Sequence, residues 1–189
     1  MKLLNLFHLP KISVPTLPNN VSDFDVQDYP NPSIERLVSV FAHAQKPAVF
    51  TAQNIRFQNL IFGAQAEDVI AQLGEPLHIM QERKNGTRYT IFWYIEPQQT
   101  EEVCWQLHFT DDLFVAATRL YRSSSELENH TPEACTDAYH NFIYAQREMR
   151  YTAVWYVTGD VRLHRKVTAF AGNDNVMPLK NTLYSLLVG

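Results

Sequence analysis

Cysteine is scarce in this chain, and long apolar runs are missing. Cys104 and Cys135 are the two cysteines among 189 residues, and neither lies in a CxxC or CxxH motif. This usage argues against both a disulfide framework and a structural zinc site, and it favours a reducing compartment. No apolar segment approaches the ~20 residues needed to span a bilayer. We therefore expect no membrane span and a cytoplasmic location.

Clustered positive charge and familiar site motifs are missing as well. The 16 Lys and Arg residues face 20 Asp and Glu residues, giving a net charge of −4. Because phosphate binding needs clustered Lys and Arg, we expect no nucleic-acid partner. The sequence contains no GxGxxG, GxxxxGK[ST], HExxH, GxSxG or EF-hand motif. We therefore predict no cofactor, no metal site and no enzymatic activity.

The composition is sufficient for one hydrophobic core. Of all residues 46% are hydrophobic and 12% aromatic, and a chain of this length buries roughly 70% of its unfolded surface. We predict a single domain over residues 33–189. Residues 1–32 are interrupted by prolines and read as an extended arm that docks on the domain or on a second copy, which would give a homodimer. Asn5 and His8 interrupt the leader-like start MKLLNLFHLP, which we interpret as mature protein.

Two helices are predicted in the first half. The segment 31–46 begins with Asn31 and Pro32, has an apolar stripe of helical period and ends before Pro47. After one strand or two short strands over 48–63, the stretch FGAQAEDVIAQLGEPL at 62–77 combines a short helix with a stop at Gly74 and an extended exit at Pro76. The residues of this stretch need no catalytic role to explain them.

The middle of the chain has the pattern of an antiparallel β meander. Two strands flank Asn85-Gly86, the strongest short hairpin signal, and two more flank Asp111-Asp112. Strict alternation over 87–96 and 102–110 indicates one apolar sheet face. The fold class that follows is α+β, with the meander sheet packed on helices on one face.

The last third is predicted to contain a helix and a second hairpin. A helix runs from Thr131 to about Arg150 by apolar spacing, and strands 151–158 and 161–170 are joined by a turn at Gly159-Asp160. Residues 179–189 fit both a strand and a short helix, so the structure of 176–189 stays open.

Few residues suggest chemistry. Cys104 and His108 share a strand face and, with His78, could hold zinc, but a buried thiol and a surface histidine explain them better. The pairs Asp111-Asp112 and Glu101-Glu102 read as solvated carboxylates at a turn and a strand start. As a nucleophile Cys135 would lack a base, because His140 faces another side of the predicted helix.

Two surface features could contact a partner. Arg162, His164 and Lys166 alternate along the predicted strand 161–170 and form a basic stripe, which suits either an acidic partner or protection of a sheet edge. Phe92, Tyr94 and Tyr156 point away from the predicted core. They form an interface patch if uncovered and a second core layer if the arm covers them.

One segment resembles a known module. The stretch IRFQNLIFGAQAEDVIAQLGEPLHIM followed by GTRYTIFWY is similar to the SmpA/OmlA (BamE) family and to β-lactamase-inhibitor-like proteins, with matches at Gly63, Val69, Leu73, Gly74 and Pro76. FGAQAEDVIAQLGEP also has a local similarity to the phagosome-assembly-factor family. The resemblance covers roughly residues 55–121. It implies an α+β fold and a protein that binds other proteins, and it carries over no catalytic residue.

These patterns lead to one functional hypothesis and one alternative. The hypothesis is a non-enzymatic protein-binding module of adaptor, inhibitor or immunity type, acting through its sheet face or its arm. The alternative is a ligand-binding or enzymatic domain with a cavity between helices and curved sheet, lined by Trp93, Trp105 and Trp155. The identity of the partner and the oligomeric state are not specified by the sequence.

Overall fold

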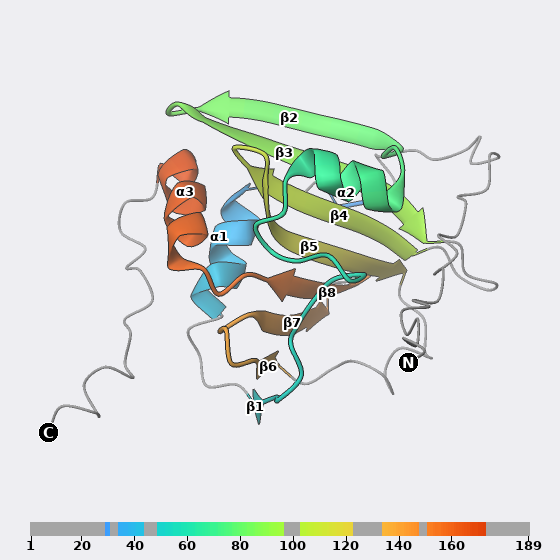
Figure 1. Ribbon diagram of the computed structural model, residues 1–189, viewed down its shortest axis with the longest axis vertical. Helices are drawn as coiled ribbons and strands as arrows, with labels where there is room; N and C mark the ends of the chain where they lie inside the picture. The colour runs from blue at the N-terminus through green and yellow to red at the C-terminus, as the bar shows by residue number, and fades with distance from the viewer. Residues whose placement is uncertain are drawn as a thin grey trace, which may run out of the picture.

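A computed structural model describes residues 29–30, 34–43, 49–96, 103–122, 134–147 and 151–172 (Figure 1). The helices are α1 (Ile34–His43), α2 (Ala66–Leu73) and α3 (Val161–Ala171). The strands are β1 (Val49–Phe50), β2 (His78–Lys84), β3 (Thr87–Glu96), β4 (Val103–Thr110), β5 (Leu113–Arg122), β6 (Cys135–Thr136), β7 (Phe142–Arg147) and β8 (Tyr151–Val157). In this part of the chain no helix has the length and apolar character that a bilayer crossing demands.

All eight strands belong to one sheet in the order β1-β6-β7-β8-β5-β4-β3-β2. Every pairing is antiparallel except that of β1 with β6. The predicted meander β2-β3-β4-β5 is confirmed. Its hairpins turn at Asn85-Gly86, with φ of 53° and 78°, and at Asp111-Asp112, with φ of 47° and 64°. These left-handed pairs match the twist of the flanking strands.

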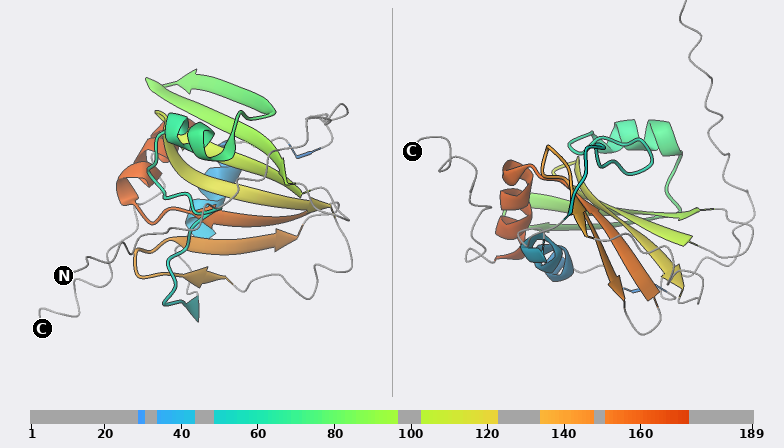
Figure 2. Two further views of the ribbon diagram at one scale, coloured as in Figure 1. Left: turned by 45° about the vertical axis from the view of Figure 1, so that its right-hand side comes forward. Right: turned by 90° about the horizontal axis from the view of Figure 1, so that it is seen from below.

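Helices cover both faces of the sheet, so the prediction of helices on one face is wrong, although the α+β class holds. Figure 2 shows α1 and α3 on one side and α2 with its preceding loop on the other. The first side buries Tyr89, Ile91 and Trp93 of β3 with Trp155 of β8. The second side buries Phe92 and other apolar residues beneath α2. Both sets of alternating residues are apolar because both faces are covered.

The segment 135–147, which lies within the helix predicted from Thr131 to about Arg150, forms β6, a turn and β7 instead. Its apolar residues are spaced for a helix, but Phe142 to Arg147 pair residue by residue with β8. The aromatic and β-branched residues at the start of β7 suit a strand in this setting. Tertiary pairing therefore overrides the local period. The predicted helix start at Thr131 lies outside the described residues.

The segment 161–170, predicted as strand, is helix α3. Leu163, Val167 and Phe170 recur at helical spacing and are buried, while Asp160 caps the helix by accepting a hydrogen bond from the Arg162 N–H at 2.8 Å. The predicted hairpin turn at Gly159-Asp160 is thus a strand-to-helix junction. Arg162, His164 and Lys166 in the same segment alternate with period two, as in a strand. The periodicity of the segment is therefore ambiguous, and the Asp160 cap is the signal that favours a helix.

Residues 49–62 form a short strand and a long loop. After β1 the chain leaves the sheet, and a tight turn at Gln58-Asn59, with φ of 48° and 64°, joins Phe57 to Leu60. Helix α2 follows as predicted, and Gly74 ends it at a φ of 88°. The prediction of one strand or two short strands over 48–63 is correct for Val49–Phe50, and beyond it the pairing is limited to single bridges such as Phe57 with Leu60.

The end of the predicted arm contacts the core. Tyr29 is buried, with its ring centroid 6.3 Å from that of Trp93, and the Gln106 side chain donates a hydrogen bond to the Pro30 carbonyl at 3.1 Å. The rest of residues 1–32, and the segment 176–189, lie outside the described residues.

Candidate functional site

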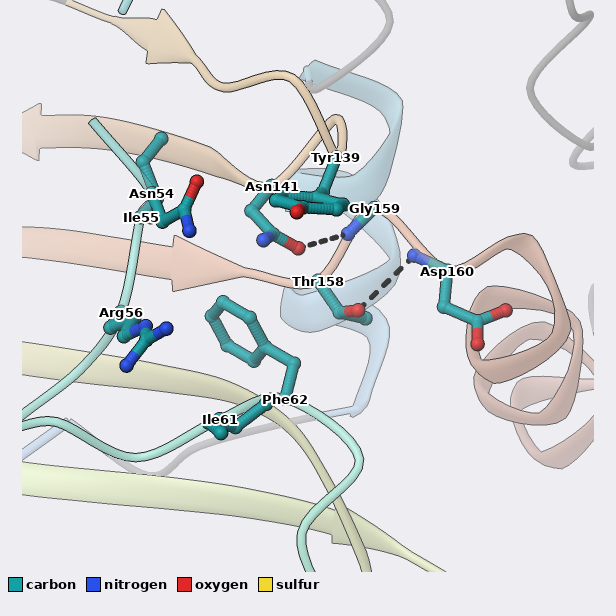
Figure 3. Close-up of a pocket in the computed structure, with 10 residues that line it drawn as sticks. All are labelled: Asn54, Ile55, Arg56, Ile61, Phe62, Tyr139, Asn141, Thr158, Gly159 and Asp160. Atoms are coloured by element: carbon teal, nitrogen blue, oxygen red, sulfur yellow. Dashed lines mark hydrogen bonds between the residues drawn. The ribbon is translucent and has the colours of Figure 1, made fainter. Parts of the chain in front are cut away.

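A pocket lies where β8 leads into α3, on the side of the sheet that carries the loop 54–62 (Figure 3). Its volume is about 370 Å³, and it is open to solvent on one side. It is lined by Asn54, Ile55, Arg56, Ile61, Phe62, Tyr139, Asn141, Thr158, Gly159 and Asp160. We call this hollow the loop pocket, because three loops that are distant in the sequence form its walls.

Asp137 joins two of these walls. Its carboxylate is buried and accepts hydrogen bonds from the Ile55 N–H at 2.7 Å and from the Tyr139 and Asn141 N–H groups, each at 2.9 Å. The Asn141 side-chain amide adds a fourth bond at 3.1 Å. An aspartate that accepts N–H groups two and four positions ahead closes a tight turn. The same side chain therefore shapes the 137–141 turn and holds the loop at Ile55 against it.

Asn141 and Gly159 join the turn to the third wall. The Asn141 Oδ1 atom accepts a hydrogen bond from the Gly159 N–H at 2.9 Å. A Cβ atom at Gly159 would lie 2.2 Å from the Tyr139 carbonyl oxygen and 2.5 Å from the His140 carbonyl carbon. Two backbones thus touch here, and only glycine allows this approach without movement.

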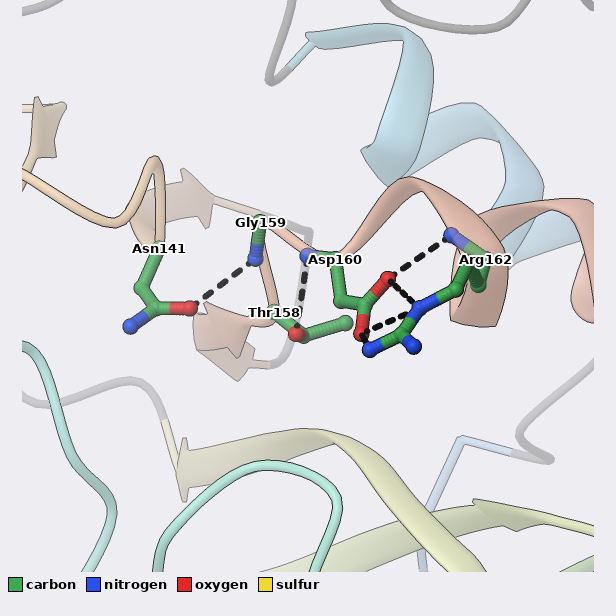
Figure 4. A network of polar contacts seen from close by, with 5 residues as sticks. All are labelled: Asn141, Thr158, Gly159, Asp160 and Arg162. Atoms are coloured by element: carbon green, nitrogen blue, oxygen red, sulfur yellow. Dashed lines mark hydrogen bonds and ion pairs between the residues drawn. The ribbon is translucent and has the colours of Figure 1, made fainter.

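The junction between β8 and α3 forms the wall opposite Arg56. Figure 4 shows its polar contacts: the Thr158 hydroxyl accepts a bond from the Asp160 N–H at 3.1 Å, and the Asp160 carboxylate binds Arg162 through both its backbone and its guanidinium group. These bonds hold the pKa of Asp160 below its usual value. Asp160 is therefore an ionised helix cap with its charge already paired.

His164 supports this wall from behind. Its ring stacks on Phe41 of α1 at a centroid distance of 4.1 Å, and its Nε2–H donates to the Thr158 carbonyl oxygen at 2.5 Å. Burial lowers the pKa of His164, against the effect of its bond to Thr158. The neutral imidazole of His164 therefore connects helix α1 to the pocket wall, by stacking on Phe41 and by its hydrogen bond to Thr158.

Arg119 holds the loop at Phe57. Its guanidinium lies over the Phe57 ring at 5.4 Å and over the Trp105 ring at 5.7 Å. The Glu96 Oε2 atom lies 3.8 Å from the Arg119 Nη2 atom, and it accepts a hydrogen bond from the Trp105 indole N–H at 2.8 Å. This arrangement anchors the loop immediately after Arg56, so the pocket wall is tied to the sheet on both sides.

The rim of the pocket is apolar and exposed. Ile61 is 62% exposed and Tyr139 is 66% exposed, which places them among the most exposed large apolar residues of the described chain. Arg56, which is also exposed, lines the same pocket and has no carboxylate partner among the described residues. An apolar rim around an unpaired guanidinium can bind a chain that carries both apolar and acidic groups.

The six residues predicted as a possible interface do not come together. Phe92 and Tyr94 are buried and Tyr156 is partly buried beneath the loop 55–65 and α2, so they form the second core layer predicted as the alternative to an exposed interface patch. The loop and α2 cover these rings, in place of the predicted arm. Tyr94 donates to the Gly74 carbonyl oxygen at 3.0 Å, and burial raises the pKa of its hydroxyl.

The predicted basic stripe is also divided. Arg162, His164 and Lys166 lie on helix α3 instead of a strand, so they do not share one face. Arg162 is exposed and pairs with Asp160, His164 is buried, and Lys166 binds Asp111 at 2.9 Å. Protection of a sheet edge requires a strand, and a basic stripe requires exposed, available charges, so neither interpretation applies to these three residues.

The zinc candidates do not form a site. His108 is buried between Tyr89, whose hydroxyl lies 2.6 Å from Nδ1, and Thr118, 3.3 Å from Nε2. Burial lowers the pKa of His108 to about 3. Cys104 is buried and His78 is exposed on β2. In the described ranges no three His, Cys, Asp or Glu side chains gather in a way that could hold a metal ion.

The other residues considered for chemistry are held in ion pairs, lie outside the described residues or have an unreactive thiol. Asp111 binds Lys166, Asp112 binds Arg88, and Glu101-Glu102 lie outside the described residues. Cys135 is in β6, where burial and the charge of Asp137 raise the pKa of its thiol. A thiol with a raised pKa is a poor nucleophile.

The three tryptophans predicted to line one cavity lie in two separate clusters of the core. Trp93 and Trp155 are almost fully buried in the core beneath α1, and Trp105 packs edge-on against Phe57 with ring centroids 5.3 Å apart. The loop pocket lies elsewhere and was missed, because its walls are loops. The segment DAYHN at 137–141 does carry a local signal, since an aspartate before such a loop favours a side-chain-closed turn.

Comparison with protein-family models, with curated proteins and with solved structures found no match for this chain. The similarity to the SmpA/OmlA module therefore stays a prediction. The assignment of a functional site depends on the geometry of the loop pocket.

Proposed function

We propose that the protein is a non-enzymatic protein-binding module that holds a segment of a partner in the loop pocket. The observation that carries this proposal is an open hollow of about 370 Å³ with a rim at which Ile61 and Tyr139 are exposed. Its volume falls within the range of about 300–1,000 Å³ of small-molecule sites, but those sites bury most of their ligand, whereas this pocket is partly open to solvent. A partly open pocket with an exposed apolar rim suits one or two side chains of a larger partner.

The rigidity of the pocket supports the same function. Asp137, Asn141 and Gly159 connect the three walls by hydrogen bonds and a close backbone approach. Binding to such a preorganised surface loses little conformational entropy. The exposed rim then adds apolar area around the hollow, which is the arrangement of an anchor pocket at a protein interface.

The lining of the pocket favours binding over catalysis. Among its ten lining residues none is a histidine, cysteine or lysine. The one carboxylate, Asp160, is paired with Arg162, which lowers its pKa. General acid–base catalysis needs a group whose pKa lies near the working pH and whose proton can move. The polar side chains of the 141–160 wall have fixed hydrogen-bond partners instead, and Arg56 carries a guanidinium, which stays protonated at any working pH.

The experiment is an affinity purification from an extract of the source cells with three forms of the full chain. The pocket variant combines Ile61→Ser with Tyr139→Ser. The control is Ile79→Ser, because Ile79 is 49% exposed on β2 at the opposite edge of the sheet. We expect a partner that is retained by the wild type and by the control but not by the pocket variant. Equal capture by all three forms, or no capture by the wild type, would contradict the proposal.

A further inference from the structure

Resting on the proposed function, we infer that the loop pocket recognises an acidic side chain flanked by an apolar residue in an extended segment of the partner. Arg56 binds the carboxylate, and the rim at Ile61 and Tyr139 binds the neighbouring apolar side chain. Three observations carry this inference: the ion pairs of the arginines, the bonding of the nearby carboxylates, and the exposed apolar residues at the rim and on β1.

Arg56 shares with Arg83 and Arg165 the lack of an ion pair among the described residues, but it alone of these three lines the loop pocket. Arg88 pairs with Asp112, Arg119 with Glu96 and Arg162 with Asp160. Arg56 lines a pocket and faces no carboxylate within the described residues. A guanidinium presents donors in a planar fork that matches a carboxylate with two parallel hydrogen bonds. The group that fits this position is therefore a carboxylate supplied from outside.

The carboxylates near the pocket leave Arg56 available. Asp160 is bound by Arg162, with Oδ2 2.7 Å from Nη2 and Oδ1 3.1 Å from Nε. Asp137 is buried and accepts four hydrogen bonds, which stabilise its charge within the protein. An incoming acid therefore meets one unpaired positive charge and two negative charges that already have partners.

The pocket offers different surroundings to the acidic side chain and to the apolar side chain of such a ligand. In Figure 3, Asn54 and Arg56 lie to one side, Thr158 and Asp160 lie to the other, and the Phe62 ring projects between them. An acid that binds Arg56 is thus next to an aromatic surface. The adjoining residue of the ligand then reaches Ile61 or Tyr139 at the rim.

A second pair of exposed apolar residues lies a few positions before the pocket lining in the chain. Val49 and Phe50 of β1 are 57% and 64% exposed, and residues 51–53 connect β1 to the Asn54 wall. β1 is the last strand of the sheet, and the Val49 and Thr51 N–H groups bond to the carbonyl oxygens of Ala134, just before β6, and Thr136 of β6. The alternation of a strand directs the backbone groups of Phe50 outward. An extended partner segment can therefore run from this edge to the pocket.

The test selects random heptapeptides displayed on phage against the full chain. Parallel selections use the Arg56→Gln and Arg56→Glu variants, the Ile61→Ser/Tyr139→Ser variant and the control Arg83→Gln, which changes an exposed arginine on the opposite edge strand β2. Each enriched peptide is then measured by fluorescence polarisation. Thermal unfolding of every variant checks that the fold is retained, as expected for exposed positions.

We expect wild type and Arg83→Gln to enrich Asp or Glu beside an aromatic or aliphatic residue. Arg56→Gln should weaken such a peptide about tenfold or more, since a charge-assisted bond is lost, and Arg56→Glu should select Lys or Arg instead. If the enriched peptides lack acidic residues but still require Ile61 and Tyr139, the inference that Arg56 recognises a carboxylate is wrong, and the proposed function of the pocket stands. Enrichment unaffected by the rim variant, or no enrichment, would overturn the proposed function as well.

Discussion

The meander from β2 to β5 and the loop pocket are stabilised in different ways. In the meander, neighbouring strands are joined by two-residue turns at Asn85-Gly86 and Asp111-Asp112, and each strand pairs with the next along the chain. In the pocket, Asp137 binds the backbone of Ile55, 82 positions away. Local signals thus build the first region, whereas a few long-range bonds build the second.

This difference separates a region that tolerates change from one that depends on single residues. A strand ladder spreads its stability over many hydrogen bonds, so each contributes little. In the pocket, Asp137 alone accepts four bonds, and Gly159 alone allows the backbones to touch. We therefore expect matched substitutions to be more destabilising in the pocket than in the meander.

The largest effect is expected from comparing Gly159→Ala with Gly86→Ala. A Cβ at Gly159 would meet the Tyr139 carbonyl oxygen at 2.2 Å, so the backbone must move, at a cost of roughly 3 kcal/mol. At Gly86 nothing lies within 4 Å of the added Cβ, and the φ of 78° costs about 1 kcal/mol. Urea unfolding measures both free energies. Equal losses would show that the approach at Gly159 is not tight.

A second pair compares Asp137→Asn with Asp111→Asn. Each substitution replaces one carboxylate oxygen with an NH₂ group, so it changes an acceptor into a donor. At Asp137 the new amide would face N–H donors inside the protein, so we expect a loss of about 2 kcal/mol. At Asp111 the carboxylate is partly exposed, and asparagine tolerates its φ of 47°, so the loss should be about 0.5 kcal/mol. Chemical denaturation tests this order, and the reverse order would contradict the role of Asp137 as the joint between walls.

The pH dependence of stability should sharpen the comparison further. Burial lowers the pKa of His108 to about 3, below the value near 6.5 of the unfolded chain. As the pH falls below 6.5 the unfolded state takes up a proton that the folded state refuses, so stability falls by up to about 1.4 kcal/mol per pH unit until pH 3. His164, whose pKa is also lowered by burial, adds to this slope just below pH 6.5.

The measurement is urea unfolding between pH 7 and pH 4.5, above the usual range of the aspartates. His108→Gln should reduce the slope, because it removes the titrating group beside Tyr89 and Thr118. His78→Gln, at an exposed position on β2, is the control for the loss of an imidazole. An unchanged slope in His108→Gln would show that His108 is protonated in the folded protein.

The same contrast explains which features could be predicted from the sequence. The meander was predicted correctly because Asn85-Gly86 and strict alternation are short-range signals. α3 was predicted as a strand because Arg162, His164 and Lys166 alternate, although the Asp160 cap decides for a helix. β7 was predicted as a helix because its apolar spacing fits 3.6 residues, while its pairing with β8 decides for a strand.

The pocket could not be predicted in the same way. The turn at 137–141 has a local signal in Asp137, but nothing in the sequence indicates that its carboxylate also binds Ile55. The need for glycine at 159 arises from contact with Tyr139 and His140, twenty positions earlier in the chain, and becomes visible with the fold. The predicted interface failed for a related reason: the covering of Phe92 and Tyr94 by residues 55–73 is a tertiary event.

The smallest effect is expected where the two regions are linked by an ion pair. Lys166 of α3 binds Asp111 of the β4–β5 turn at 2.9 Å, and both side chains are about 40% exposed. Such pairs contribute about 0.5 kcal/mol and weaken with salt. Lys166→Met should therefore lower the free energy of unfolding by about this amount at low salt and by less at 1 M NaCl. A loss above about 1.5 kcal/mol that salt does not reduce would mean that the pocket region and the meander depend on each other, since then the turn at Asp111-Asp112 would need α3 to form.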